Sequence, residues 1–144
     1  MSQAVLERVR EQLLHRHFDQ NSTARRKVSW LPCHAVDLNS DGGELNAHVD
    51  SVRFSGDIVA GLSLQSPSIM RLQHAHKNDT NNKESQLGHV DLHLPPLSLY
   101  VLTGPSRFTF THQLLPTGSR FADTVVERGH RVSVIFRDAK VEEE

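Results

Sequence analysis

The sequence predicts a mainly β domain with one helix at its N-terminus, and three observations carry this prediction. Residues 3 to about 18 space their apolar side chains as a helix does. From Trp30 onward, short β-branched or alternating stretches are separated by turn-forming residues. The chain has 144 residues, a length that suits one domain. One helix followed by several short strands is typical of a β-sandwich or barrel with a helix packed outside.

The predicted N-terminal helix is amphipathic. Ser2 precedes it at a position suited to an N-cap, and the apolar residues at helical spacing are Val5, Leu6, Val9 and Leu13. The polar run after the helix holds the basic cluster at residues 25–27. We interpret this cluster as a solvated loop, because no aromatic residues are interleaved with it to stack nucleic-acid bases.

Seven stretches then have strand character, and turn or loop residues lie between them. They are residues 33–38, 58–64, 68–74, 89–94, 98–102, 108–112 and 131–136. The polar loop at residues 76–88 is expected to be the least ordered part of the chain.

Composition argues against several classes of function. With 16 Lys and Arg against 17 Asp and Glu, the chain lacks a field that would gather polyanions, so nucleic-acid binding is unsupported though not excluded. The single cysteine, Cys33, cannot form an internal disulfide, and we interpret it as a small buried hydrophobic residue. No apolar run is long enough to cross a bilayer, and a secretory signal is not recognisable. We therefore predict a soluble, intracellular monomer that is not bound to a membrane.

Three His-x-Asp pairs are candidate metal sites, whereas chance alone would give roughly 0.6 at this composition. The pair at residues 17 and 19 ends a helix, where positions two apart do not face each other. The pair His89 and Asp91 lies in HVDLHL, whose alternation is typical of a half-buried strand with its polar face in water. A zinc site formed with His93 is the alternative there.

The pair His48 and Asp50 differs from the other two because a suitable third ligand lies further along the chain. His112 ends SRFTFTH, where alternation would place it on one face with Phe108 and Phe110, so we expect it to point inward. A core imidazole with a hydrogen-bond partner is the alternative for His112.

A second pattern lies in RVSVIFR, which places Arg131, Ser133, Ile135 and Arg137 on one strand face. Taken alone, this stretch could be a half-exposed edge strand with two surface arginines.

Taken together, the order His-x-Asp, distal His and Arg-x5-Arg resembles the AlkB family of Fe(II)- and 2-oxoglutarate-dependent dioxygenases. The resemblance runs from about residue 4 to residue 140 and rests on HVDSVRFSGDIVAGLSLQSPSIMRL, LPPLSLYVLTGPSRFTFTH and RVSVIFR. Within the family, the chain is most similar to the mitochondrial AlkB-homologue subgroup linked to programmed necrosis and fatty-acid metabolism. The resemblance implies a double-stranded β-helix, or jelly roll, and a place in the mitochondrial matrix.

The resemblance also implies a site. His48, Asp50 and His112 match the Fe(II) ligands, and Arg131 matches the arginine that pairs with the far carboxylate of 2-oxoglutarate. Tyr100 matches a tyrosine that hydrogen-bonds this cosubstrate, with packing against the sheet as its alternative role. Arg137 matches a second cosubstrate arginine, but it lies six residues from Arg131, roughly 20 Å along a strand, so it must lean inward or the strand must bend.

The chain departs from the family in two places. ELNA precedes His48 where an aromatic residue and a proline are common, and only 47 residues precede the triad. We therefore expect residues 1–144 to form a single oxygenase domain that lacks the N-terminal part of the usual one. The predicted activity is O2-dependent hydroxylation or demethylation of a protein or small molecule. The alternatives are an RNA or DNA demethylase, a non-catalytic jelly-roll binding module and a zinc hydrolase.

Overall fold

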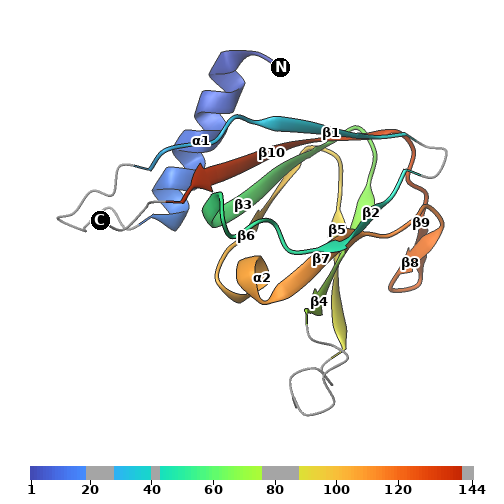
Figure 1. Cartoon of the computed structure of the whole chain (residues 1–144). Coiled ribbons are helices and arrows are strands. Elements are labelled where there is room, and N and C mark those ends of the chain that lie inside the picture. Colours follow the sequence, from blue (N-terminus) through green and yellow to red (C-terminus); the bar gives the residue numbers. More distant parts are fainter. Residues whose placement is uncertain (19–27, 40–42, 76–87, 141–144) are drawn as a thin grey trace, which may run out of the picture.

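Two four-stranded antiparallel sheets face each other, and one long helix lies outside them (Figure 1). The computed structural model describes residues 1–18, 28–39, 43–75 and 88–140. Its elements are α1 (Gln3–His17), β1 (His34–Leu38), β2 (Leu45–His48), β3 (Ser55–Leu64), β4 (Ser68–His74), β5 (His89–Leu94), β6 (Ser98–Leu102), α2 (Pro105–Phe108), β7 (Phe110–Leu114), β8 (Ser119–Phe121), β9 (Thr124–Val126) and β10 (Arg131–Ala139).

The strand order confirms the predicted jelly roll. One sheet has the order β1-β10-β3-β6 and the other β2-β7-β4-β5, so the chain crosses repeatedly from sheet to sheet. β8 and β9 form a separate hairpin between the last two strands of the roll. This arrangement leaves the space between the two large sheets as the interior in which a site can be built.

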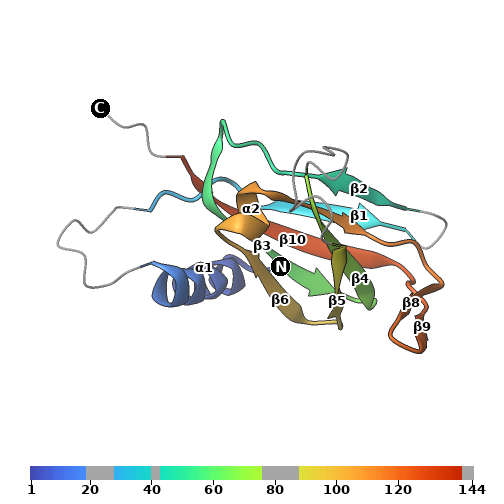
Figure 2. The ribbon, with the colours of Figure 1, turned by 90° about the horizontal axis from the view of Figure 1, so that it is seen from below.

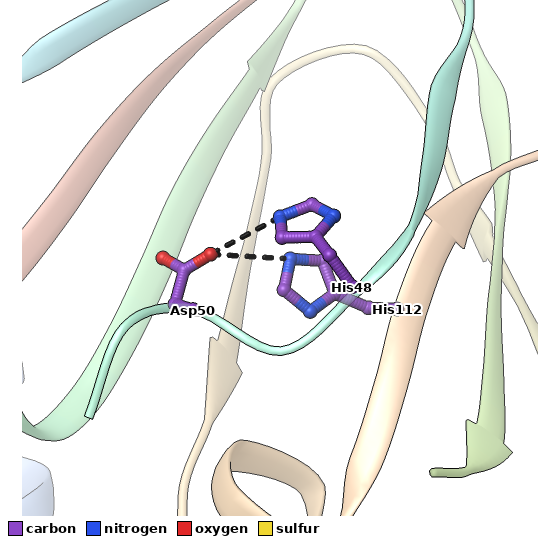
Figure 3. Close-up of side chains that lie close together, drawn as sticks. All are labelled: His48, Asp50 and His112. Atoms are coloured by element: carbon purple, nitrogen blue, oxygen red, sulfur yellow. Dashed lines mark hydrogen bonds and ion pairs between the residues drawn. The ribbon is translucent and has the colours of Figure 1, made fainter.

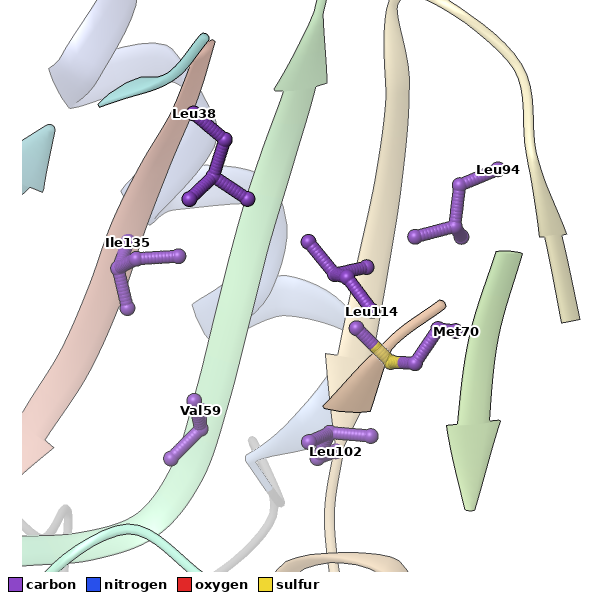
Figure 4. Packing of buried hydrophobic residues seen from close by; sticks show 7 residues of the cluster. All are labelled: Leu38, Val59, Met70, Leu94, Leu102, Leu114 and Ile135. Atoms are coloured by element: carbon purple, nitrogen blue, oxygen red, sulfur yellow. The ribbon is translucent and has the colours of Figure 1, made fainter. Parts of the chain in front are cut away.

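The core between the sheets is determined by the alternation of each strand. Apolar side chains from both sheets meet there (Figure 4): Leu38, Val59, Met70, Leu94, Leu102, Leu114 and Ile135. Met70 is fully buried and lies on β4 opposite Leu114 of β7. Because successive residues of a strand alternate between faces, these positions also fix which polar residues point inward.

Helix α1 covers the outer face of the sheet that contains β3 and β10 (Figure 2). Leu13 is its one buried residue, and it packs with Ile58, Ala60, Val134 and Phe136 of that face. Ser2 occupies the predicted N-cap position, but its side chain makes no capping hydrogen bond. The amphipathic pattern therefore placed the helix correctly, whereas the predicted cap contact is absent.

Strand β10 lies inside its sheet, so the edge-strand alternative is wrong. It pairs with β1 on one side and with β3 on the other. Ile135 packs into the core between the sheets, whereas Phe136 packs against α1. Both faces of β10 are covered, and its two arginines belong to the interior face rather than to the surface.

Strand prediction succeeded for long segments and failed for short ones. The predicted strands at 68–74, 89–94 and 98–102 agree with β4, β5 and β6, while those at 33–38, 58–64 and 131–136 correspond to β1, β3 and β10 with shifted ends. The short strands β2, β8 and β9 were missed. The basic cluster at 25–27 and nearly all of the 76–88 loop lie outside the described residues. Cys33 is half-buried against the α1 side of the core.

The segment predicted as a strand at 108–112 needs a correction. Pro105 to Phe108 form the short helix α2, and pairing with β4 starts only at Phe110. Pro105 stands at the start of α2, where its missing N–H is tolerated, and Ser106 Oγ bonds to the backbone of Thr103. Phe108 is therefore partly exposed and does not share a strand face with His112.

Candidate metal centre

A β-bulge turns His48 into the interior. Leu45 pairs with Leu114 and His48 pairs with His112, so three steps along β2 match two steps along β7. In a regular strand, Leu45 and His48 would face opposite sides, but the extra residue lets both face inward. Leu45 packs on the core, and the His48 ring lies 4.3 Å from the His112 ring between their centroids.

His112 reaches the same point from β7. It lies two residues before the buried Leu114 on the same strand face, and its side chain is buried. The inward orientation predicted for His112 is therefore observed. Its partners are the side chains of His48 and Asp50.

Asp50 completes the group from the loop after β2 (Figure 3). Its Oδ1 lies 3.1 Å from His48 Nε2 and 3.9 Å from His112 Nε2. One ligand atom from each of the three residues falls within 4.8 Å of the others. Bonds of roughly 2.0–2.2 Å to a single ion keep its ligand atoms roughly 3–4 Å apart, so this set needs a contraction of less than about 1 Å to hold one first-row metal.

The hydrogen bonds of His48 also suit a ligand. Its Nδ1 lies 2.7 Å from the carbonyl oxygen of Asn46, and we assign the proton to Nδ1 because a carbonyl can only accept. That bond fixes the ring and directs Nε2 toward Asp50 and His112, as outer partners of metal-bound histidines do. An ion held by Nε2 and the carboxylate would replace the proton that otherwise links them.

The charges around the triad favour the ligand forms of Asp50 and His112. Burial acts to raise the pKa of the Asp50 carboxyl, but hydrogen bonds from His48 and Arg137, with the Arg137 charge, hold that pKa well below its usual range. Burial, with the charge of His48, lowers the pKa of His112 to about 4. The hydrogen bond to Asp50 raises the pKa of His48. The ionised Asp50 and the neutral His112 are therefore ready to bind a divalent cation, whereas a cation would have to displace a proton from His48.

Arg137 holds the other oxygen of Asp50. Its Nε donates to Asp50 Oδ2 at 2.6 Å, which leaves Oδ1 directed at the two histidines. β10 keeps its register with β3 from Val132 to Arg137, so Arg131 and Arg137 remain on one face at opposite ends. Of the two predicted possibilities, the structure shows Arg137 reaching inward to the triad.

Arg107 supports the same loop, and it was missed at the sequence level. Its guanidinium is almost fully buried and donates to the carbonyl oxygens of Asp50 at 2.9 Å and Ser51 at 3.2 Å. Phe108 covers it, with 4.8 Å between Arg107 Cζ and the ring centroid. The Gly-Pro turn at residues 104–105, shortly before the arginine, was the available signal, but we assigned the end of that stretch to a strand.

Arg131 and Tyr100 lie deeper between the sheets. Arg131 is 1% exposed, its Nε donates to Ser63 Oγ at 3.1 Å, and its Nη2 is buried without a partner. Burial raises the pKa of Tyr100 to about 12, so its hydroxyl stays protonated and can donate. An unpartnered buried guanidinium nitrogen beside a phenol suits the carboxylate that the family resemblance implies.

Tyr100 needs the glycine across from it. Gly61 of β3 pairs directly with Tyr100 of β6, and a Cβ added at Gly61 would lie 2.2 Å from Tyr100 Cζ. The ring therefore lies over the glycine, against the sheet and facing the interior.

The second His-Val-Asp sequence lies on the outer face of the other sheet. Asp91 accepts two hydrogen bonds of 2.8 Å from Arg71, its partner across β4 and β5. His89 lies 3.6 Å from Asp91, while the His93 ring lies 5.6 Å from that of Phe121, between centroids. Among the described residues, the one group of three that could hold an ion is His48, Asp50 and His112. The interpretation of residues 89–94 as a strand with a polar outer face agrees with this geometry.

A jelly roll that gathers two histidines, an aspartate and two arginines between its sheets defines a class, the metal-dependent jelly-roll oxygenases. Comparison with known proteins agrees. The chain belongs to the 2OG-Fe(II) oxygenase superfamily, whose family model matches residues 6–137.

Two curated relatives make the resemblance to AlkB proteins firm. The chain is 45% identical over 107 residues to the mouse protein named alpha-ketoglutarate-dependent dioxygenase alkB homolog 7, mitochondrial, and 41% identical over 105 residues to the bovine protein of the same name. These alignments cover 74% and 72% of this chain but 44% and 43% of the relatives. The chain thus spans less than half the length of the curated relatives it matches.

Proposed function

We propose that this chain carries the catalytic centre of an Fe(II)- and 2-oxoglutarate-dependent dioxygenase that hydroxylates or demethylates a protein or small molecule. The observation that carries the proposal is the convergence of His48, Asp50 and His112 on one point, with a buried and partly unpaired Arg131 on the same interior. When bound, Fe(II) and 2-oxoglutarate supply the oxidation of a C–H bond by O2, coupled to loss of CO2 from the keto acid to give succinate.

In this proposal His48, Asp50 Oδ1 and His112 would hold the ion, which would supply the redox chemistry of the cosubstrate and oxygen. Arg137 orients Asp50 through its second oxygen, and Arg107 holds the Asp50 backbone. Because these contacts come from β10 and α2, the loop that carries Asp50 is fixed from two directions. Fixed ligands are what a centre with open coordination positions needs.

The cosubstrate lies between the triad and Arg131 in this proposal. Arg131 and the protonated Tyr100 donate to its far carboxylate, with Ser63 steadying the Arg131 side chain. Ion pairing inside the sandwich is strong only if the guanidinium is fully paired, and Arg131 Nη2 still lacks a partner. A carboxylate would satisfy it.

The surroundings of the triad favour an apolar or peptide-like substrate over a polyanion. Val52 and Phe54, close behind Asp50 in the chain, are 53% and 63% exposed, and Phe108 beside Arg107 is 44% exposed. A nucleic acid would need a basic groove, and the formal charge of the chain is −1. Because the names of both relatives include the word mitochondrial, we propose a mitochondrial location for this chain. We also propose the role in programmed necrosis and fatty-acid metabolism that is linked to the subgroup. Within the described residues, no helix is long and apolar enough to cross a membrane.

The test is an anaerobic titration with Fe(II) and then 2-oxoglutarate, monitored by calorimetry and by the charge-transfer absorption of the chelate. Wild type and His93→Ala, a control on the outer strand face, are expected to form the chelate, and His112→Ala is not. Admission of O2 should then release succinate in the first two. Absence of the chelate in folded wild-type protein, or its persistence in His112→Ala, would contradict the proposal.

A further inference from the structure

A second buried arginine lies at the same end of the sandwich as Arg131. Arg128 precedes β10 and stands three residues before Arg131 in the chain. It is 4% exposed, and Arg131 is 1% exposed. Arginine is rarely buried to this extent unless it is paired, so each of these two residues calls for a partner.

The contacts of Arg128 account for only part of its guanidinium. Its Nη2 donates to the carbonyl oxygen of Gly43, just before β2, so the side chain reaches from one sheet toward the other. Backbone hydrogen bonds hold this position as well. The Arg128 amide donates to Thr117 Oγ1 at 2.9 Å, and the Gly129 amide donates to Ser66 Oγ at 2.7 Å. The position of Arg128 is therefore set by the fold on several sides.

Three nitrogens of the two guanidiniums are buried with no hydrogen-bond partner: Nε and Nη1 of Arg128, and Nη2 of Arg131. Within the described part of the chain, no carboxylate forms an ion pair with either arginine. Unpaired buried donors and unpaired buried charges both cost free energy. Burial lowers the pKa of Arg131, Tyr100 acts to raise it, and the charge of Arg128 lowers it further. The two guanidinium groups therefore repel each other.

An anion would satisfy both groups at once. A carboxylate offers two oxygens with about four acceptor positions, enough for donors from two guanidiniums. We infer that Arg128 and Arg131 form a two-arginine carboxylate site at the interior end opposite Arg137, and that Arg128 is a cosubstrate-binding residue that selects dicarboxylic 2-oxo acids. This inference rests on the proposed function, because it places the far carboxylate of the bound keto acid between the two arginines.

The experiment compares two keto acids that differ only at the far end. 2-Oxoglutarate and 2-oxopentanoate are titrated anaerobically by calorimetry into the Fe(II)-loaded full chain, and the ratio of their dissociation constants gives the preference for the dicarboxylate. The variants are Arg128→Gln and Arg128→Lys, and Arg120→Gln is the control, because Arg120 is an exposed arginine of β8 that donates to the Asp123 carbonyl. Fe(II) affinity and thermal unfolding are recorded for each.

Arg128→Gln is expected to reduce the preference for 2-oxoglutarate at least tenfold, with the affinity for 2-oxopentanoate and for Fe(II) unchanged. Arg120→Gln should keep the wild-type preference. Arg128→Lys retains a cation but only one donor centre, so its preference should lie between those of wild type and Arg128→Gln. A purely structural role would weaken both keto acids by the same factor.

The outcomes separate the two proposals. If wild type forms no chelate, the proposed function fails and this inference fails with it. If wild type forms the chelate but Arg128→Gln keeps the wild-type preference, or loses affinity for both keto acids equally, only this inference is overturned. Should Arg128→Gln not fold, a wild-type preference in Arg128→Lys overturns it instead.

Discussion

The two His-Val-Asp sequences of this chain have the same three residues and opposite environments. At residues 48–50, a bulge turns His48 inward and the strand ends, which leaves Asp50 free to turn toward both histidines. At residues 89–91, β5 keeps a regular register with β4, so His89 and Asp91 stay on the outer face. The tripeptide alone therefore does not specify a metal site. The bulge and the end of β2 next to the first copy create the site.

The largest expected effect comes from removing the carboxylate of the first copy. Asp50→Ala removes a predicted ligand and leaves Arg137 without its partner. Losing a hydrogen-bond partner of a ligand typically costs 10–100-fold in metal affinity, so losing the ligand itself should cost more than about 100-fold. Fe(II) affinity by calorimetry and succinate formation check this, with thermal unfolding to show that the variant is folded. Retention of succinate formation would contradict the comparison.

Arg107 tests whether the first copy depends on a fixed loop. Arg107→Gln removes a buried cation that donates to the carbonyls of Asp50 and Ser51. We expect Fe(II) affinity to fall by roughly 10–100-fold, as it does when a ligand loses its support. Turnover should recover at saturating Fe(II), because the ligands themselves remain.

Arg53→Gln is the control for Arg107→Gln. Arg53 lies in the loop that carries Asp50, but its side chain is exposed and lies over the Phe54 ring. A variant Arg107→Gln that is folded, binds Fe(II) as wild type does and yet loses turnover would show that Arg107 acts in some way other than by holding the loop.

A smaller effect is expected at the glycine that accommodates Tyr100. Gly61→Ala places a Cβ 2.2 Å from the Tyr100 ring, so the ring must move. Overpacking of this kind costs about 1–3 kcal/mol of stability, and the displaced hydroxyl should weaken 2-oxoglutarate more than Fe(II). Gly88→Ala is the matched control beside the second copy, because a Cβ there meets nothing within 4 Å. Equal losses in the two alanine variants would refute this role for Gly61.

Regular strand pairing explains which parts of the fold the sequence predicted. β4, β5 and β6 keep an uninterrupted register with their neighbours, and their bounds were predicted correctly, whereas β2 is short and bulged and was missed. Periodicity assumes one residue per step on each strand, and a bulge breaks that assumption. The inward position of His112 was predictable from Phe110 and the core pattern. The inward position of His48 was not predictable from any strand pattern. His48 was selected only because the order His-x-Asp, distal His and Arg-x5-Arg resembles that of the AlkB family.

The buried arginines could not be predicted in the same way. Arg107 lies in a helix of four residues and Arg128 in a connection, where no period indicates which side chain turns inward. An arginine is usually exposed, so the sequence gives no reason to expect burial at these two positions. Their burial is explained only by the folded structure, in which the carbonyl oxygens of Asp50, Ser51 and Gly43 accept their hydrogen bonds. Arg131 and Arg137, by contrast, lie on a strand whose alternation puts both on one face.

The smallest effect should result from the same change made in the second copy. Asp91→Ala removes the two hydrogen bonds that Arg71 donates to Asp91. This ion pair is only partly shielded from water, because the Asp91 side chain is 18% exposed and the Arg71 side chain 28%. Ion pairs at such positions contribute about 0–1 kcal/mol, so chemical denaturation should show a loss no larger than that. Fe(II) affinity and succinate formation should equal those of wild type, because β5 lies at the far edge of its sheet from β2. A loss of Fe(II) binding in Asp91→Ala would mean that the outer face takes part in metal binding, and the distinction between the two copies would then collapse.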